Sequence, residues 1–234
     1  MKSVKILPQP NDTTCGPTAL HAVYNYYGDV ISLEKVINGV HALKEGGTLA
    51  VLLACHALER GYNASIYTYN LKLFDPTWNV SDKREIIQKL IHQKKSKKGK
   101  KLHKATQAYI NFLNLGGNLY YEDLDVHLFD KFFKMEQPIL TGLSATYLYN
   151  CKRETTNSKN ESIYDDLRGF PTGHFVVLNG FDEKQNVIVA DPYQENPVSY
   201  GNYYSVNPQR LINAIMLGIV TYDANLLIIS PKSK

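Results

Sequence analysis

The chain has few cysteines and lacks a long hydrophobic run. Its 234 residues contain three cysteines, Cys15, Cys55 and Cys151, and an odd number cannot close a full set of disulfides, which indicates a reducing compartment. The purest apolar run covers residues 49–55, far short of the ~20 residues that a membrane-spanning helix needs. A proline at position 8 interrupts the first segment before any hydrophobic region, so no secretory signal is expected. We therefore predict a cytoplasmic protein without a membrane span.

Positive charge is concentrated in one segment and scarce elsewhere. The formal net charge is +4, but seven lysines gather near one point and leave the rest of the chain slightly acidic. They are Lys94, Lys95, Lys97, Lys98, Lys100, Lys101 and Lys104. Such a run is typical of a solvated loop or helix end. Nucleic-acid binding is the weaker alternative, because no aromatic RNA-binding signature or zinc-finger spacing accompanies the lysines.

The composition of the whole chain is that of a globular protein, with 44% apolar and 21% charged residues. It excludes disordered and collagen-like classes. Apolar periodicity predicts helices at about 13–27, 32–40, 48–60, 104–115, 124–135 and 208–217, and another from 81 into the lysine run. Strands are expected at 64–69, 139–143, 174–181, 187–190, 200–206 and 226–230. Helices followed by strands without regular alternation indicate an α+β fold. The polar segment 150–171 is expected to be a long loop beside the site.

One cysteine stands at the start of the first expected helix. Cys15 follows Thr13 and Thr14, either of which can cap a helix, and Pro17 suits an early helical position. The unpaired N–H groups and the positive dipole end of a helix favour a thiolate over a thiol. Cys15 is therefore a candidate nucleophile. The alternative is a small buried side chain in a capped core helix.

A histidine and an aspartate bracket a predicted hairpin far downstream. His174 begins one apolar strand and Asp191 ends the next, and the polar turn 182–186 joins the two strands. Both residues should therefore lie at the same end of the ribbon, a placement that suits an acid that orients a histidine. A satisfied core or surface histidine is the alternative for His174.

These residues together resemble a known family. The chain is similar to papain-like cysteine peptidases, and most of all to the bacterial family that includes the leader-peptide-cleaving (double-glycine peptidase-like) domains of bacteriocin exporters. That family has a glutamine six residues before a Cys-Gly pair, then a Gly-His pair on an apolar strand and an Asp-Pro pair after the next strand. Here these are Gln9, Cys15-Gly16, Gly173-His174 and Asp191-Pro192. The motif spans most of the chain.

The resemblance implies a fold and roles. A helical N-terminal lobe that carries Cys15 would pack on a C-terminal antiparallel sheet that carries His174 and Asp191. Cys15 would be the nucleophile, His174 its base and later the acid, and Asp191 the group that orients the imidazole. Gln9, with the backbone N–H of Cys15, would stabilise the oxyanion. The implied activity is hydrolysis of a peptide or related amide bond.

The chain also differs from the exporter domains. Thr14 stands where these domains usually carry an acidic residue, and no nucleotide-binding glycine loop is present, so cleavage of a leader during export is not expected. The segment from about 71 to 137 is longer and more helical than the family requires. We interpret it as a helical insertion in one papain-like domain over residues 1–234, one that could shape or cover the substrate groove.

Several alternatives stay open at this stage. The same fold could bind a peptide without cutting it, or the same triad could transfer an acyl group to an amine, as a transglutaminase or amidase does. No metal or organic cofactor is expected, because the remaining histidines form no ligand spacing with the cysteines. They are His21, His41, His56, His92, His103 and His127. The expected partner is a peptide or protein substrate.

Overall fold

The computed structural model describes residues 2–41, 43, 47–79, 81–157 and 162–232. The helices are α1 (Cys15–Tyr26), α2 (Leu33–Gly39), α3 (Ala50–Glu59), α4 (Lys83–Ser96), α5 (Lys100–Asn114), α6 (Val126–Lys134), α7 (Ala145–Tyr149), α8 (Pro208–Leu217) and the 3-10 turn η1 (Gly218–Thr221). The strands are β1 (Tyr62–Thr68), β2 (Asn118–Tyr120), β3 (Ile139–Ser144), β4 (Glu154–Thr156), β5 (Ser162–Tyr164), β6 (Gly173–Phe181), β7 (Val187–Ala190), β8 (Tyr203–Val206) and β9 (Asn225–Pro231).

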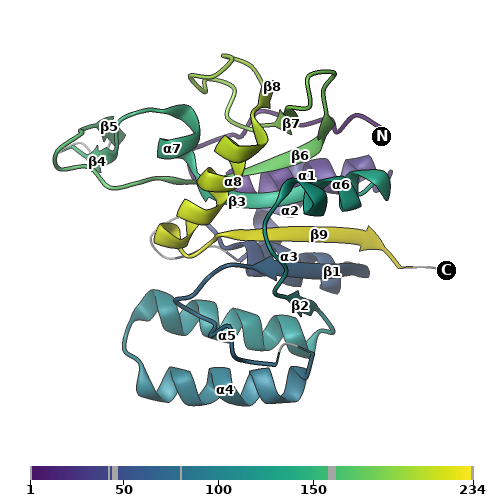
Figure 1. The fold of residues 1–234 in the computed structure, drawn as a ribbon, viewed down its shortest axis with the longest axis vertical. Helices are drawn as coiled ribbons and strands as arrows, with labels where there is room; N and C mark the ends of the chain where they lie inside the picture. Colours follow the sequence, from purple (N-terminus) through teal and green to yellow (C-terminus); the bar gives the residue numbers. More distant parts are fainter. Residues whose placement is uncertain (1, 42, 44–46, 80, 158–161, 233–234) are drawn as a thin grey trace.

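One large sheet organises the molecule (Figure 1). Its seven strands lie in the order β2-β1-β9-β3-β6-β7-β8. Neighbouring strands are antiparallel except β1 and β2, which run parallel. The strand of the first half, β1, pairs with β9 near the C-terminus over the whole of its length. The two halves of the chain are therefore joined through one sheet.

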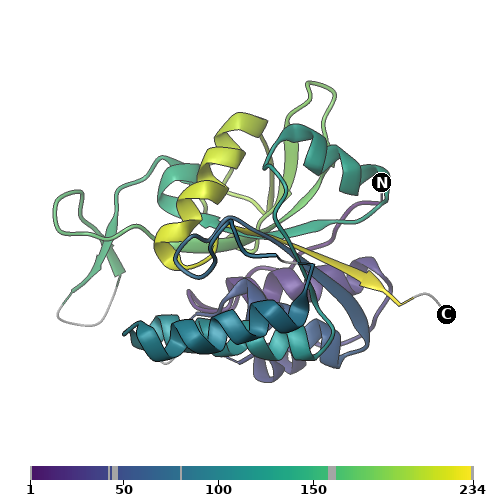
Figure 2. The same cartoon turned by 60° about the horizontal axis from the view of Figure 1, so that its bottom comes forward.

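Helices cover both faces of this sheet, as Figure 2 shows. Helices α1 to α5 pack on one face, where Leu140, Val177 and Leu227 of the sheet join their core. Helices α6, α7 and α8 pack on the other face against Ile139, Val176 and neighbouring strand residues. Successive side chains of a strand point to opposite faces. With a core on each side, the central strands are apolar at nearly every position.

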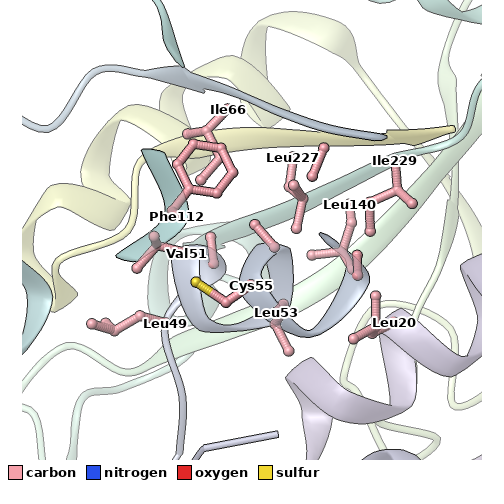
Figure 3. Close-up of a cluster of buried hydrophobic side chains, with 14 of the residues drawn as sticks. Leu20, Leu49, Val51, Leu53, Cys55, Ile66, Phe112, Leu140, Leu227 and Ile229 are labelled. Atoms are coloured by element: carbon pink, nitrogen blue, oxygen red, sulfur yellow. The ribbon is translucent and has the colours of Figure 1, made fainter. Parts of the chain in front are cut away.

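The core between the sheet and helices α1 to α5 holds α1 in place. In Figure 3, Leu20 of α1 and Leu53 of α3 lie below Leu140, Leu227 and Ile229 of the sheet, and all five belong to one core. Leu20 and Leu53 are fully buried. Burying such a side chain contributes about 1.5–3 kcal/mol, so this packing holds the helix that begins at Cys15.

The α+β fold is confirmed, as are most of the expected elements. Helix α8 matches its predicted bounds, and most of the other predicted elements are found with small differences at their ends. The prediction for 150–171 was incomplete, because this segment contains the two-stranded sheet of β4 and β5. Helix α7 and strand β2 were also not predicted. No helix in the described part of the chain has the length and apolar character that crossing a membrane requires.

Candidate active site

Cys15 is the first residue of α1, which is buried along almost its whole length. The loop before it is held by its own polar groups. The Thr14 hydroxyl donates to the Asn11 carbonyl at 2.9 Å, and the Thr13 N–H donates to Asn11 Oδ1 at 3.0 Å. Only 9% of Cys15 is exposed. The backbone N–H groups of Cys15 and Gly16 have no acceptor within the helix, so they place two donors beside this cysteine.

Gly16 brings the start of α1 close to the sheet. A Cβ atom at this position would lie 2.6 Å from Thr48 Cγ2 and 3.2 Å from Phe175 Cδ2. Phe175 is the neighbour of His174 in β6. The absence of a side chain at Gly16 therefore allows the Cys15 end of the helix to approach the strand that carries the histidine.

His174 and Asp191 meet across the β6–β7 hairpin. Val177 pairs with Ala190 in this hairpin, so Asp191 follows the strand at the end where His174 enters. His174 Nε2 and Asp191 Oδ1 are 2.7 Å apart. The predicted hairpin, with both residues at one end, is confirmed. Because Nε2 faces the carboxylate, Nδ1 is the ring nitrogen that remains for a thiol.

The Asp191 carboxylate is enclosed and fully hydrogen-bonded. Its side chain is 0% exposed. The Tyr193 N–H donates to Oδ1 at 2.8 Å, while the Tyr149 and Tyr204 hydroxyls donate to Oδ2 at 2.8 and 2.7 Å. Burial favours the neutral acid, but the interactions with His174 and the two hydroxyls hold the pKa of Asp191 below its ordinary value. The group is therefore a permanent negative charge beside the imidazole.

The electrostatics of His174 involve both of its neighbours. Burial disfavours the charged ring, but the Asp191 carboxylate and a hydrogen bond and charge interaction with Cys15 outweigh that penalty and raise the pKa of His174 to about 10. The other two cysteines differ. Burial raises the pKa of Cys55 to about 12 and also raises that of Cys151. Of the three thiols, only Cys15 acts on this histidine.

Gln9 lies at the same site. Its backbone N–H donates to the Pro192 carbonyl at 2.8 Å, which ties the loop before α1 to the residue after Asp191. The side-chain Nε2 donates to the Asn11 carbonyl at 3.0 Å. Oε1 is buried and has no hydrogen-bond partner among the described residues. An amide nitrogen carries two N–H donors, so one remains for a ligand.

A pocket of about 470 Å³ opens beside Gln9 and His174. It is lined by Gln9, Asp12, Ala145, Tyr149, Glu154, Ser162, Ile163, Tyr164, Thr172, Gly173, His174 and Tyr193. The segment 150–171 supplies four of these residues, so its expected place beside the site is confirmed. Among the residues that the structure describes, the segment 71–137 supplies none of the lining residues of this pocket.

Sequence reasoning missed the groups that hold Asp191. Asn202 fixes its backbone, accepting from the Asp191 N–H at 2.8 Å and donating its side-chain amide to the Asp191 carbonyl at 2.7 Å. Tyr149 and Tyr204 supply the hydroxyls. The chain has 17 tyrosines, and nothing in their spacing distinguishes these two. The asparagine follows a glycine in a polar turn, which is an ordinary turn signal.

The other candidates lie outside this site. The lysine run spans the end of α4 and the start of α5, where Lys94 Nζ donates to Gln107 and Lys97 Nζ donates to Gln93. His56 bonds the Tyr24 hydroxyl at 2.8 Å. Within the described ranges, no group of three or more His, Cys, Asp or Glu side chains is placed to hold a metal ion.

Comparisons with known proteins give a family match and a shared fold. A family model described as the Peptidase C39-like family matches residues 1–209. No protein of curated function matches the chain by sequence. Among solved structures, the chain is similar to a protein from Bacillus anthracis described as a C39-like peptidase, with 16% identity, a TM-score of 0.53, and coverage of 99% of this chain and 96% of the other. This similarity shows a shared fold.

Two further structures have lower TM-scores. The peptidase domain of Streptococcus ComA, described as a bifunctional ABC transporter of a quorum-sensing pathway, has 14% identity and a TM-score of 0.44, over 98% of this chain and all of that domain. Xylellain, a cysteine protease from Xylella fastidiosa, has 14% identity and a TM-score of 0.42, over 100% of this chain and 85% of the other.

Proposed function

Because the chain belongs to the Peptidase C39-like family, we propose that it is a cysteine hydrolase that cleaves a peptide or related amide bond, with Cys15 as nucleophile. The observation that carries the proposal is the buried His174–Asp191 pair at 2.7 Å, whose ring also interacts with Cys15. A nucleophile, a base and a group that orients the base are the parts that covalent amide hydrolysis needs.

The reaction begins with proton transfer within this triad. His174 Nδ1 accepts the thiol proton of Cys15, and the thiolate attacks the carbonyl carbon of the substrate. The tetrahedral intermediate collapses as the imidazolium gives its proton to the leaving amine, which leaves a thioester on Cys15. Water then attacks the thioester with His174 as base, the carboxylic acid departs and the thiol is restored. The raised pKa of His174 supports a charged imidazolium near neutral pH, the form that protonates the leaving amine.

Gln9 is the proposed oxyanion donor, together with the backbone N–H of Cys15. Gln9 lines the pocket with His174, and its amide uses one N–H on Asn11, which leaves the second for the developing negative charge. A donor of this kind typically contributes about 2.7–4 kcal/mol to lowering the barrier. Replacing Gln9 with alanine should therefore lower kcat by about 10²–10³-fold.

Selective alkylation tests the activated thiol without a known substrate. Near neutral pH, iodoacetamide should label Cys15 at least about tenfold faster than Cys55 or Cys151, because burial raises the pKa of both other thiols. Peptide mapping by mass spectrometry measures the three rates. A His174→Ala variant should lose the preference for Cys15. Equal labelling of the three cysteines in the native protein contradicts the proposal.

Digestion of a complex peptide library tests the hydrolysis itself. The native protein should create new N-termini, whereas Cys15→Ala should create none and Cys55→Ala should behave as the native protein does. Cys55 is the matched control because its thiol faces the Ala108 carbonyl in the core at 3.7 Å. Uncut peptides with the native protein would favour a binding module, and new amide products with an added amine would favour acyl transfer.

The proposal extends to the organisation of the chain. We take residues 1–234 as one peptidase domain, since α5 of the 71–137 segment packs in the same core as α1 and α3. A peptide or protein is the proposed substrate, and the cytoplasm is the proposed location.

A further inference from the structure

The pocket beside His174 carries negative charge and aromatic rings. Asp12 lies on the loop before α1, and Glu154 is the first residue of β4, yet both line the pocket. The rings of Tyr149, Tyr164 and Tyr193 also line it, and none of the lysines or arginines that the structure describes does. The pocket volume of about 470 Å³ lies within the usual range for ligand sites.

These two carboxylates are not neutralised by their surroundings. Within the described ranges, neither Asp12 nor Glu154 takes part in an ion pair. The Glu154 carboxylate accepts a hydrogen bond from Ser162 Oγ at 2.6 Å. Three basic side chains of the described part of the segment 150–171 have other partners: Arg168 pairs with Asp165, Lys152 Nζ lies 3.9 Å from Asp166 Oδ2, and Arg153 donates to the backbone carbonyls of Asp166 and Leu167.

The field in the pocket is negative as a result. The pKa of Tyr193 is raised first by burial and then by the carboxylates of Glu195, Asp12 and Glu154. A phenol becomes harder to ionise when negative charge surrounds it, and the same field attracts a cation.

The hydrogen-bonding groups in the pocket favour the same kind of ligand. The carboxylates of Asp12 and Glu154 supply hydrogen-bond acceptors in the pocket. Ammonium and guanidinium groups are pure donors, and the faces of Tyr164 and Tyr193 add a surface that attracts cations.

We infer that this pocket binds a basic side chain, lysine or arginine, of the peptide substrate next to the bond that is cut. Asp12 and Glu154 are then the residues that determine specificity, and Tyr164 and Tyr193 flank the bound cation. The inference rests on the proposed function, because it assigns the pocket to a substrate of Cys15 and His174. Its test must therefore separate binding from cleavage.

Binding is measured with the Cys15→Ala variant, which cannot form an acyl-enzyme. The probes are fluorescent nonapeptides of alanine and glycine, each with one lysine at a different position, and a second set with norleucine in place of lysine. Norleucine keeps the aliphatic chain and removes the charge. At the position that reaches the pocket, fluorescence anisotropy should show about tenfold tighter binding of the lysine peptide, the size expected for one charge-assisted hydrogen bond.

Two further variants assign the preference to the pocket. Asp12→Asn with Glu154→Gln in the Cys15→Ala background should remove the preference for lysine, and Glu154→Lys should reverse it toward a glutamate peptide. Glu183→Gln is the control, because it removes one negative charge from the exposed turn at the far end of the β6–β7 hairpin. This control should keep the preference, and circular dichroism checks that each variant is folded.

The outcomes distinguish the inference from the proposed function. The inference is overturned if no lysine peptide binds more tightly than its norleucine partner, or if the preference survives in the double variant. Each peptide is also incubated with the native protein and analysed by mass spectrometry. Lysine-dependent binding without cleavage would refute the hydrolase and leave the binding inference standing. Cleavage that does not depend on the lysine would support the hydrolase and overturn the binding inference.

Discussion

The carboxylate of Asp191 receives four hydrogen bonds although water does not reach it. An isolated buried carboxylate would be neutralised by a rise in its pKa. Here Tyr149 and Tyr204 hold Oδ2, so Oδ1 faces the ring of His174. The two hydroxyls thus keep the group charged and also fix which oxygen orients the imidazole.

Removing one of these hydroxyls should weaken catalysis without abolishing it. In Tyr204→Phe, Oδ2 keeps only the Tyr149 bond, so the pKa of Asp191 should rise and the ring of His174 should be less firmly oriented. We expect kcat to fall by about 5–10-fold with KM unchanged, because one hydrogen bond contributes about 1–1.4 kcal/mol. The acid limb of the pH–rate profile should move to higher pH.

Tyr203→Phe is the control for this experiment. Its hydroxyl accepts from the Ile6 N–H at 3.0 Å and does not reach Asp191. Loss of activity in both variants, with no shift of the acid limb, would mean that the tyrosines act only on stability.

The charge state of His174 can be read directly. Its pKa is raised from 6.5 to about 10, so the folded state binds its proton more tightly than the unfolded state does. The group therefore contributes stability that is complete below about pH 6.5 and is lost as the pH rises through about 10. The NMR signal of the ring should show a charged imidazole at about pH 8. In Asp191→Asn the ring should be neutral at that pH, and the alkaline loss of stability in urea unfolding should be smaller.

A ring that titrates near its ordinary pKa in the native protein would contradict this prediction. Asp182→Asn serves as the control, because Asp182 lies in the turn of the same hairpin and bonds the backbone of Asn186 instead.

At the scale of elements, the packing of Gly16 decides where Cys15 lies. A methyl group at this position would meet Thr48 Cγ2 at 2.6 Å and Phe175 at 3.2 Å. We expect Gly16→Ala to lose about 1–3 kcal/mol of unfolding free energy through overpacking, and to lose activity by moving Cys15 relative to His174. Urea unfolding and peptide cleavage measure the two effects.

A second substitution should repair this variant. Thr48→Ser removes the Cγ2 atom and keeps the hydroxyl that donates to the His41 carbonyl, so Gly16→Ala with Thr48→Ser should recover stability and activity. Gly201→Ala is the control, since its nearest atom would be Ser199 Oγ at 3.9 Å. A Gly16→Ala variant as stable and active as the native protein would show that the contact does not constrain the helix.

The β6–β7 hairpin could be predicted from sequence, and the β4–β5 pair could not. Strands β6 and β7 are apolar because both faces of the sheet are covered, and a polar turn of Asp182 to Asn186 joins them. Strand β5 is exposed at all three of its positions, so burial imposes no alternation on its sequence. The start of α3 was also misplaced, because no side chain near Leu49 caps it.

At the scale of the whole molecule, the candidate site is assembled from distant segments. Cys15, His174 and Asp191 could be predicted because each marks the start or end of an element and their order along the chain resembles a family. The Asp191 contacts of Tyr149 and Tyr204 could not, because they depend on how α7 and β8 pack beside the hairpin. Neither could the meeting of Asp12 with Glu154 in one pocket. Local patterns predict elements, but contacts between elements require the packed fold.

Asp223 is another long-range contact, and it gives the molecule a second dependence on pH. It lies just before β9, and its Oδ1 accepts from the N–H of Ala50, the first residue of α3, at 3.1 Å. The side chain thus supplies the cap that the local sequence of α3 lacks. Burial raises the pKa of Asp223 from 3.8 to about 7, although Ala50 and Lys101 oppose the rise.

A buried acid of this kind should lower stability as the pH rises. Between about pH 4 and about pH 7 the unfolded chain loses the proton while the folded chain retains it, so the free energy of unfolding falls through this range. Asp223→Asn keeps an oxygen acceptor for Ala50 and cannot ionise. The unfolding free energy of this variant minus that of the native protein should be larger at about pH 8 than at about pH 5. Urea unfolding at both pH values measures this difference.

Two further variants separate charge from capping. Asp223→Ala removes the acceptor and should cost about 1 kcal/mol through the lost cap of α3, whereas Glu183→Gln removes an exposed charge and should follow the native pH dependence. If Asp223→Asn and the native protein change in parallel from about pH 5 to about pH 8, the carboxyl is already ionised in the fold. In that case a charged cap, and not a protonated one, would join the C-terminal part of the sheet to α3.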